Sequence, residues 1–117
     1  MISCVTSMNK EYYDSIGKVM LESWLKYWPG EISIILYAEK FVPDLVDRRL
    51  IIKDWDESCL INFNDYIKLA KGPALKFAKK GFAFLNAMEN VSAGRLIWLD
   101  ADLLFYLQEI LSIRKGH

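Results

Sequence analysis

The sequence has few of the residues on which several common classes of function depend. Its 117 residues include two cysteines and one histidine, and Cys4 and Cys59 stand far apart with no second pair. A disulfide framework and the usual zinc spacings are therefore excluded. The 15 basic and 15 acidic residues give a formal net charge of zero, so the chain lacks the basic excess with which nucleic-acid-binding proteins hold phosphates.

Long hydrophobic runs are also missing. No apolar stretch approaches the roughly 18 residues of a membrane-spanning helix, and the amino-terminal segment has no basic region ahead of an apolar core, as a signal peptide would. Hydrophobic residues nevertheless make up 53% of the chain and charged residues 26%, which is a globular composition. We therefore expect one soluble, cytoplasmic domain over residues 1–117, since independently folding units are commonly about 100–150 residues long.

Short apolar runs alternate with helical periodicity along the chain. Four runs are predicted as strands, and the second of them is nearly continuous in apolarity, as in a strand that is covered on both faces. The predicted strands are Ile2–Thr6, Ile32–Ala38, Leu50–Ile52 and Arg95–Leu99. Strands that alternate with helices predict βαβ units, and hence an α/β, three-layer fold with a mostly parallel sheet of about four strands.

Two segments have the apolar spacing of helices. The first begins near Ser15 and is ended by Pro29-Gly30. The second is predicted over Leu75–Val91, and a helical wheel divides it into two sides. One broad side carries Phe77, Phe84, Leu85, Met88 and Val91. The other side carries Lys76, Lys79, Lys80, Asn86 and Asn90 around the small residues Ala83 and Ala87.

Polar residues follow each predicted strand, where the carboxyl ends of parallel strands form the edge at which ligands bind. Asp100 and Asp102 come directly after the fourth strand, and residues two apart on an extended chain point the same way. Two carboxylates on one side repel each other unless a positive charge lies between them. Mg²⁺ or Mn²⁺, which prefers oxygen ligands, would supply that charge. A solvated aspartate pair is the alternative.

Lysine is concentrated just before this aspartate pair. Five lysines and no acidic residue occur between Tyr66 and Met88, mostly on the helix that precedes the fourth strand. A diphosphate that bridges a cation on one side and a lysine ammonium on the other would satisfy both groups. For any single lysine, a solvated helical face is the alternative.

These residues together resemble the nucleotide-sugar glycosyltransferases of the GT-A fold. The most specific part of the resemblance is the D-x-D in Leu96–Asp102, and the helical run Phe77–Ala83 precedes it as in that family. The opening Cys4–Asn9 with Tyr12-Tyr13, and the later Leu36–Glu39, are similar to the start of the same group. The resemblance spans nearly the whole chain, in order.

The resemblance implies a nucleoside site near the end of the first strand. Thr6 and Ser7 would lie beside the nucleoside, and one of Tyr12 or Tyr13 would pack near the base. For the two tyrosines, simple packing over the first helix is the alternative.

The resemblance also implies a diphosphate site. Asp100 would contact the ribose or share the metal, and Asp102 would bind the Mn²⁺ or Mg²⁺ that grips the diphosphate. Lys80 matches the family's basic helix position best, with Lys76 one turn earlier on the same face. The leaving group in sugar transfer is a nucleoside diphosphate, and a cation with a lysine would stabilise the charge that develops on it.

By this resemblance the chain is the donor-binding part of a metal-dependent glycosyltransferase that uses a nucleoside-diphosphate sugar, with UDP-sugars favoured. The family continues with an acceptor-binding half, whereas this sequence ends 15 residues after Asp102, and no catalytic base is identified. One alternative is a nucleotide-binding module without turnover. A more distant one is a phosphohydrolase with an aspartate nucleophile, in which Thr or Val usually stands where this chain has Leu104. An open sheet edge would also favour self-association.

Overall fold

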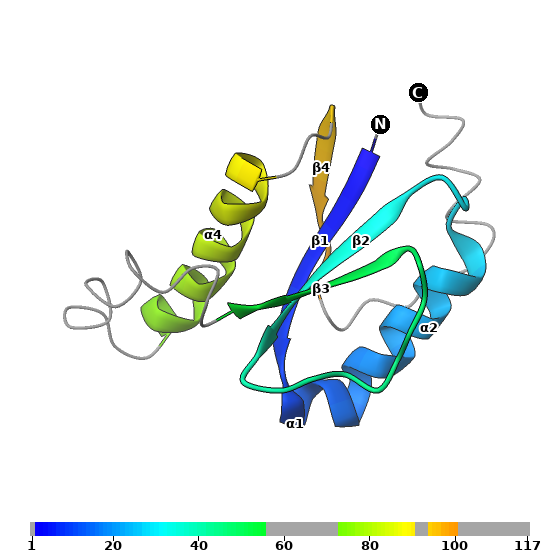
Figure 1. The fold of residues 1–117 in the computed structure, drawn as a ribbon. Helices are drawn as coiled ribbons and strands as arrows, with labels where there is room; N and C mark the ends of the chain where they lie inside the picture. Colours follow the sequence, from blue (N-terminus) through cyan, green and yellow to red (C-terminus); the bar gives the residue numbers. More distant parts are fainter. Residues whose placement is uncertain (1, 56–72, 91–93, 101–117) are drawn as a thin grey trace.

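The computed structural model describes residues 2–55, 73–90 and 94–100, of which 73–79 are described by their backbone alone. Four strands and the helices between them follow one another along the chain (Figure 1). They are β1 (Ile2–Asn9), α1 (Lys10–Tyr12), the π-helical segment η1 (Tyr13–Gly17), α2 (Lys18–Tyr27), β2 (Ser33–Glu39), β3 (Leu50–Asp54), α4 (Pro73–Asn90) and β4 (Arg95–Trp98). Within the described segments, no helix combines the length and the apolarity needed to cross a membrane.

The four strands form one parallel sheet in the order β3-β2-β1-β4. One row of the register runs across all of them, because Ile51 pairs with Ile35, Ile35 with Val5, and Val5 with Trp98. The predicted α/β class and the mostly parallel sheet of about four strands are confirmed.

The first strand is longer than its composition suggests. The polar residues after Thr6 were expected to end it, yet β1 continues to Asn9 because it pairs with β2 as far as Glu39. Asn9 then starts the helix, since its side-chain Oδ1 accepts a hydrogen bond of 2.8 Å from the backbone N–H of Tyr12. The helical region therefore begins at Lys10 and not near Ser15.

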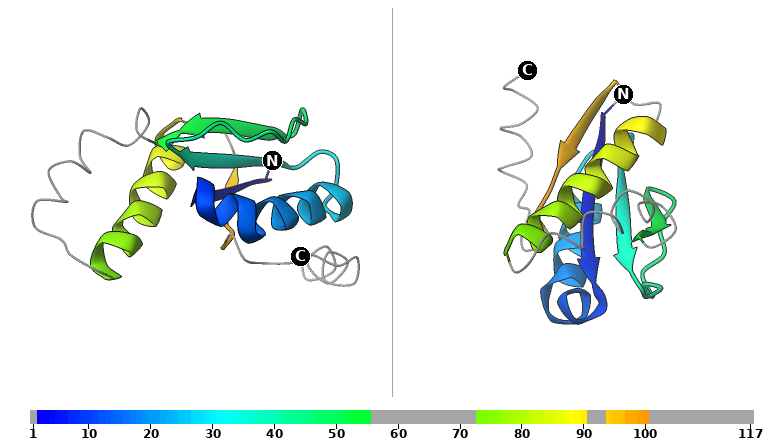
Figure 2. Two further views of the ribbon diagram at one scale, coloured as in Figure 1. Left: turned by 90° about the horizontal axis from the view of Figure 1, so that it is seen from below. Right: turned by 90° about the vertical axis from the view of Figure 1, so that its left-hand side faces the viewer.

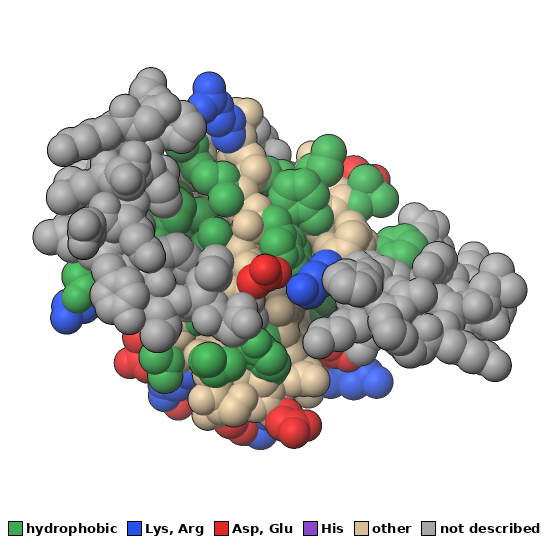
Figure 3. All heavy atoms as spheres, turned by 180° about the vertical axis from the view of Figure 1, so that it is seen from behind, with side chains coloured by type: hydrophobic (Ala, Val, Ile, Leu, Met, Phe, Trp, Pro, Cys, Tyr) green, Lys and Arg blue, Asp and Glu red, His purple; other side chains and the backbone are tan. Residues whose placement is uncertain are grey.

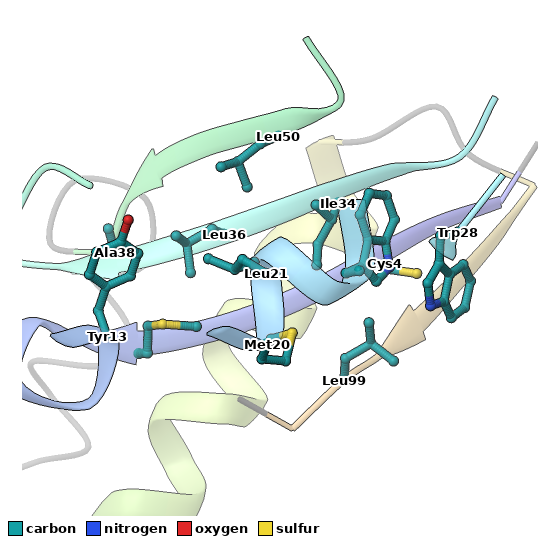
Figure 4. Packing of buried hydrophobic residues seen from close by; sticks show 12 residues of the cluster. Cys4, Tyr13, Met20, Leu21, Trp28, Ile34, Leu36, Ala38, Leu50 and Leu99 are labelled. Atoms are coloured by element: carbon teal, nitrogen blue, oxygen red, sulfur yellow. The ribbon is translucent and has the colours of Figure 1, made fainter. Parts of the chain in front are cut away.

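One face of the sheet is covered by α2. Met20, Leu21 and Trp24 of this helix are fully buried, and they pack against even-numbered strand residues such as Cys4 and Leu36 (Figure 4). Residues two apart in a strand share a face, so the even positions of β1 and β2 build this larger core.

The opposite face is covered by α4, so the described elements form three layers (Figure 2). The helix turns its small residues toward the sheet: Ala83 and Ala87 are fully buried, whereas Leu85 and Met88 are 43% and 58% exposed. The side of the helix that carries the larger aliphatic residues is therefore not the one that packs. Bulky rings supplied by the sheet, such as that of Tyr37, fill the space beneath the alanines.

Gly17 marks the closest approach of the helical region to the sheet. A Cβ atom built on this glycine would overlap the sulfur of Met8, which is buried at the end of β1. Gly81, in the middle of α4, is exposed, and a Cβ atom there would meet no atom within 4 Å. Close packing therefore requires a glycine at position 17, whereas the structure leaves room for a side chain at position 81.

Replacing each glycine by alanine tests this difference. Gly17→Ala should lower the free energy of unfolding by about 1–3 kcal/mol, because the new methyl group overpacks a filled site. Gly81→Ala should raise it by about 0.5–1 kcal/mol, because alanine is the better helix former and has room there. Urea unfolding of both variants measures the effect. Stabilisation of the same size by both substitutions would contradict the close packing of η1 on β1.

Candidate functional site

The strand order creates a switch point at the carboxyl ends of β1 and β4. The chain moves from β1 to β2 and β3 on one side, and then crosses to β4 on the other side of β1. The connecting helices α2 and α4 leave on opposite faces. In parallel sheets a crevice forms at such a point, and ligands bind there.

Asp100 lies at this switch point. It stands two residues beyond Trp98, the last residue of β4. The backbone N–H of Leu99 donates to the carbonyl of Val5 at 2.8 Å, which continues the pairing of the two strands past Trp98. The predicted position of Asp100 after the end of the fourth strand is confirmed, but the end of β4 lies beside Val5, four residues before β1 ends at Asn9.

Two donors meet on one oxygen of the Asp100 carboxylate. Lys80 Nζ lies 3.3 Å from Oδ1, and the indole Nε1 of Trp98 lies 3.3 Å from the same atom. In the part of the chain that the structure describes, both contacts of this carboxylate end on Oδ1. Oδ2 therefore offers a further acceptor position.

Helix α4 contributes to this corner from two positions one turn apart. Lys80 reaches the carboxylate, and Phe84 meets the ring of Trp98 edge-on, with centroids 6.1 Å apart and an interplanar angle of 83°. The face of α4 that packs against the sheet is therefore also the face that carries Lys80. Although the wheel places Lys80 on the polar side, that side is not fully solvated, because Ala83 and Ala87 bring it onto the sheet.

The charged pair is open to solvent. The side chain of Lys80 is 39% exposed and that of Asp100 is 57% exposed. The surface in Figure 3 likewise has acidic and basic side chains next to one another among hydrophobic ones. An exposed ion pair contributes little to folding, commonly about 0–1 kcal/mol. Its charges therefore remain accessible to a ligand.

Thr6 and Ser7 are separated by the alternation of the strand. Ser7 is half-buried and shares the α4 side of the sheet with Val5. Thr6 is fully buried on the α2 side, between Cys4 and Met8, and its Oγ1 has no hydrogen-bond partner among the described residues. Of the two residues predicted to lie beside a nucleoside, the structure places only Ser7 on the side that holds Asp100 and Lys80.

Tyr13 has a different environment from the one expected near a base. It is 3% exposed within the core on the α2 side, its ring lies 5.3 Å from that of Phe41, and its hydroxyl donates to Asp44 Oδ1 at 2.6 Å. Lys18 Nζ lies 2.9 Å from Asp44 Oδ2. Tyr13 thus fastens the segment after β2 to the helix, whereas Tyr12, the other candidate, is 36% exposed.

Two predicted site residues lie beyond what the structure describes. Asp102 is outside the described residues, and Lys76 belongs to α4, but only its backbone is described. Among the described residues, no group of three or more histidine, cysteine, aspartate or glutamate side chains could hold a metal ion. The metal site at Asp100 and Asp102 therefore stays a prediction.

Two contacts of the structure were not among the predicted site interactions. The indole N–H of Trp98, a residue of the apolar fourth strand, donates to Asp100. The signal was available, because residues two apart on an extended segment point the same way. The hydrogen bond of 2.6 Å from the Tyr37 hydroxyl to Asn86 Oδ1 could not be found, since its partners are 49 residues apart.

Comparison with known proteins identifies no relative of this chain. No family model matches the sequence, and no curated protein or solved structure is significantly similar to it.

The Tyr13–Asp44 contact predicts how stability varies with pH. The Tyr13 hydrogen bond, followed by that of Lys18, lowers the pKa of Asp44, so this stabilisation is present above the unfolded value of about 3.9 and is lost as the pH falls through the folded pKa. Burial, followed by Asp44, raises the pKa of Tyr13 to about 12. Its stabilisation is therefore present below about pH 10 and is lost as the pH rises through about 12.

Tyr13→Phe should consequently flatten both the acid and the alkaline limbs of the unfolding profile, measured as the urea midpoint from pH 2 to pH 12. Lys18→Met should flatten the acid limb to a smaller extent, because Lys18 is the second cause of the Asp44 shift. It should also flatten the alkaline limb, because Asp44 raises the pKa of Lys18 above its ordinary value of 10.5, and that stabilisation is lost as the pH rises through the folded pKa. Unchanged limbs in Tyr13→Phe would contradict this assignment.

Proposed function

We propose that the chain binds a nucleoside-diphosphate sugar at the carboxyl ends of β1 and β4, as the donor-binding part of a metal-dependent glycosyltransferase. One observation carries the proposal: a lysine ammonium and an aspartate carboxylate, both exposed, meet at the switch point of a parallel sheet. A diphosphate needs positive charge around it, and a developing diphosphate leaving group needs more. The motif resemblance favours UDP-sugars.

The roles of Lys80, Ser7 and Asp100 follow from where their side chains lie, and that of Asp102 follows from the resemblance. Lys80 would neutralise a phosphate. Ser7, which lies on the same side of the sheet two residues before the end of β1, would lie beside the nucleoside. The Oδ2 of Asp100, which has no contact with the described residues, fits a hard cation, and Asp102 would be the second ligand. Mn²⁺ or Mg²⁺ held by these two carboxylates would neutralise the diphosphate as the sugar leaves.

The cellular location and the self-association of the domain are also proposed. We propose a cytoplasmic location, since the sequence predicts neither a signal peptide nor a disulfide framework. Self-association through a sheet edge is supported at β3, which pairs with β2 alone among the described strands and carries the partly exposed Ile51 and Ile52. Exposed edges of this kind favour pairing with another chain.

The role of Lys80 is tested by comparing it with its neighbour on the helix. Lys80→Ala should weaken UDP binding about tenfold, the lower end of the roughly 1.5–3 kcal/mol of a hydrogen bond to a charged group, because Lys80 is partly solvated. Uridine binding should not change, since uridine has no phosphate. Titration calorimetry of both ligands with Lys80→Ala and with Lys79→Ala makes the comparison. Equal losses of UDP affinity in the two variants would refute the assignment of the phosphate contact to Lys80.

The metal is tested at the two aspartates. In the parent chain, UDP binding should strengthen when Mn²⁺ or Mg²⁺ is added. Asp102→Asn keeps the shape of the side chain and removes the anion, so the metal effect should disappear, whereas Asp100→Asn should reduce it less, because Asp100 is shared between ribose and metal.

Asp54→Asn is the matched control, because it removes an acidic group from the end of β3, two strands away from β1. It should retain the full metal effect. A metal effect of undiminished size in Asp102→Asn would remove the cation from the proposal. Binding of UDP-sugar with no transfer or hydrolysis by the chain would identify it as a binding module.

A further inference from the structure

The two donors on Asp100 Oδ1 differ in how firmly they are held. The Trp98 ring is half-buried in the core beneath α4 and is fixed edge-on by Phe84. Lys80 reaches the same oxygen from α4 at the end of a flexible four-carbon side chain that is 39% exposed. Lys80 can therefore exchange Asp100 for another partner, whereas the contact from Trp98 is fixed by the packing of the strand.

The Lys80 ammonium and a divalent cation compete for the same carboxylate. Nζ lies 3.3 Å from Oδ1, so a cation on Asp100 would stand within a few ångströms of a second positive charge. Like charges at that separation repel, and the carboxylate cannot fully neutralise both. A diphosphate changes the balance, because it offers the ammonium a new anionic partner and the cation additional oxygen ligands.

We propose that Lys80 occupies Asp100 as an internal counter-ion that holds off the cation until a diphosphate draws the ammonium away. This inference deepens the proposed function and depends on it for the identity of the diphosphate. It makes the binding of cation and nucleotide interdependent: each prepares the site for the other, and by linkage the two strengthen each other by the same factor.

Trp98 is the positioning residue of this arrangement. Its indole N–H continues to donate to Oδ1 when Lys80 leaves, so the carboxylate keeps one hydrogen bond and its orientation. Such a fixed donor behind a metal-binding carboxylate commonly supports the affinity of the site.

The test is one substitution and two measurements, for which we expect changes in affinity of opposite sign. Lys80→Met keeps the length and apolar packing of the side chain and removes its charge. It should strengthen binding of Mn²⁺ alone, measured by electron paramagnetic resonance of the free ion, by about three- to tenfold, because water screens a single exposed charge. The same variant should weaken UDP binding in the presence of Mn²⁺.

Lys26→Met is the matched control, because it also removes one exposed positive charge, from the last turn of α2, where Lys26 lies over the ring of Tyr27. It should change neither measurement. Trp98→Phe keeps an aromatic ring against Phe84 and removes the N–H. It should weaken Mn²⁺ binding both in the parent background and in Lys80→Met.

The outcomes separate this inference from the proposed function. Mn²⁺ affinity that is unchanged or reduced in Lys80→Met overturns the counter-ion role, even if UDP binds as proposed. An increase in Mn²⁺ affinity without any UDP binding in the parent supports the counter-ion role and refutes the proposed nucleotide. Absence of Mn²⁺ binding in both the parent and Lys80→Met overturns the inference.

Discussion

The parallel pairing of β1 with β2 on one side and with β4 on the other determines the position of every other described element. A strand bonded at both edges exposes only its faces, and β1 is apolar on both, with Cys4 toward α2 and Val5 toward α4. Each connecting helix has to cover one of these faces. The switch point at the carboxyl end of β1 is therefore a consequence of the same pairing that buries the strand.

The composition of α4 determines what reaches that switch point. Because the fully buried residues of its packing face are alanines, the helix lies close to the sheet, and Tyr37 and Trp98 of the strands supply large rings to the layer beside Phe82 and Phe84 of the helix. Lys80 lies one turn before Phe84 at the same corner, so its ammonium reaches Asp100 while the pair stays open to solvent. A helix that packed through Leu85 and Met88 would have turned Lys80 away.

Two clusters in the described structure combine an aspartate, a lysine and an aromatic donor, and the burial of the aromatic donor and the bond lengths distinguish them. Tyr13 is almost completely buried and donates to Asp44 at 2.6 Å, so this cluster joins a loop to a helix. At Asp100 the contacts are longer, at 3.3 Å, and the donor Trp98 is only half-buried, while both carboxylates are exposed, Asp44 by 69% and Asp100 by 57%. Short bonds to a buried donor resist exchange, whereas longer bonds permit it.

Apolar runs and their periods were sufficient to predict the four strands, a helix over Leu75–Val91, which the structure has as Pro73–Asn90, and the parallel sheet, because local patterning decides which segments bury which residues. The same patterning placed Asp100 at the end of β4. The later end of β1 was not predictable, because partner β2 supplies the hydrogen bonds that keep polar residues in the strand.

The composition of the candidate site was decided by tertiary structure. Adjacent residues such as Thr6 and Ser7 diverge because a strand alternates between faces, whereas Lys80 and Asp100 converge across 20 positions because α4 packs through its alanines. Sequence alone determined which elements form and which residues stand at their ends. Only the packing of the helices on the two faces of β1 decided which of those residues meet, since contacts between distant segments depend on the shape of the layer that separates them.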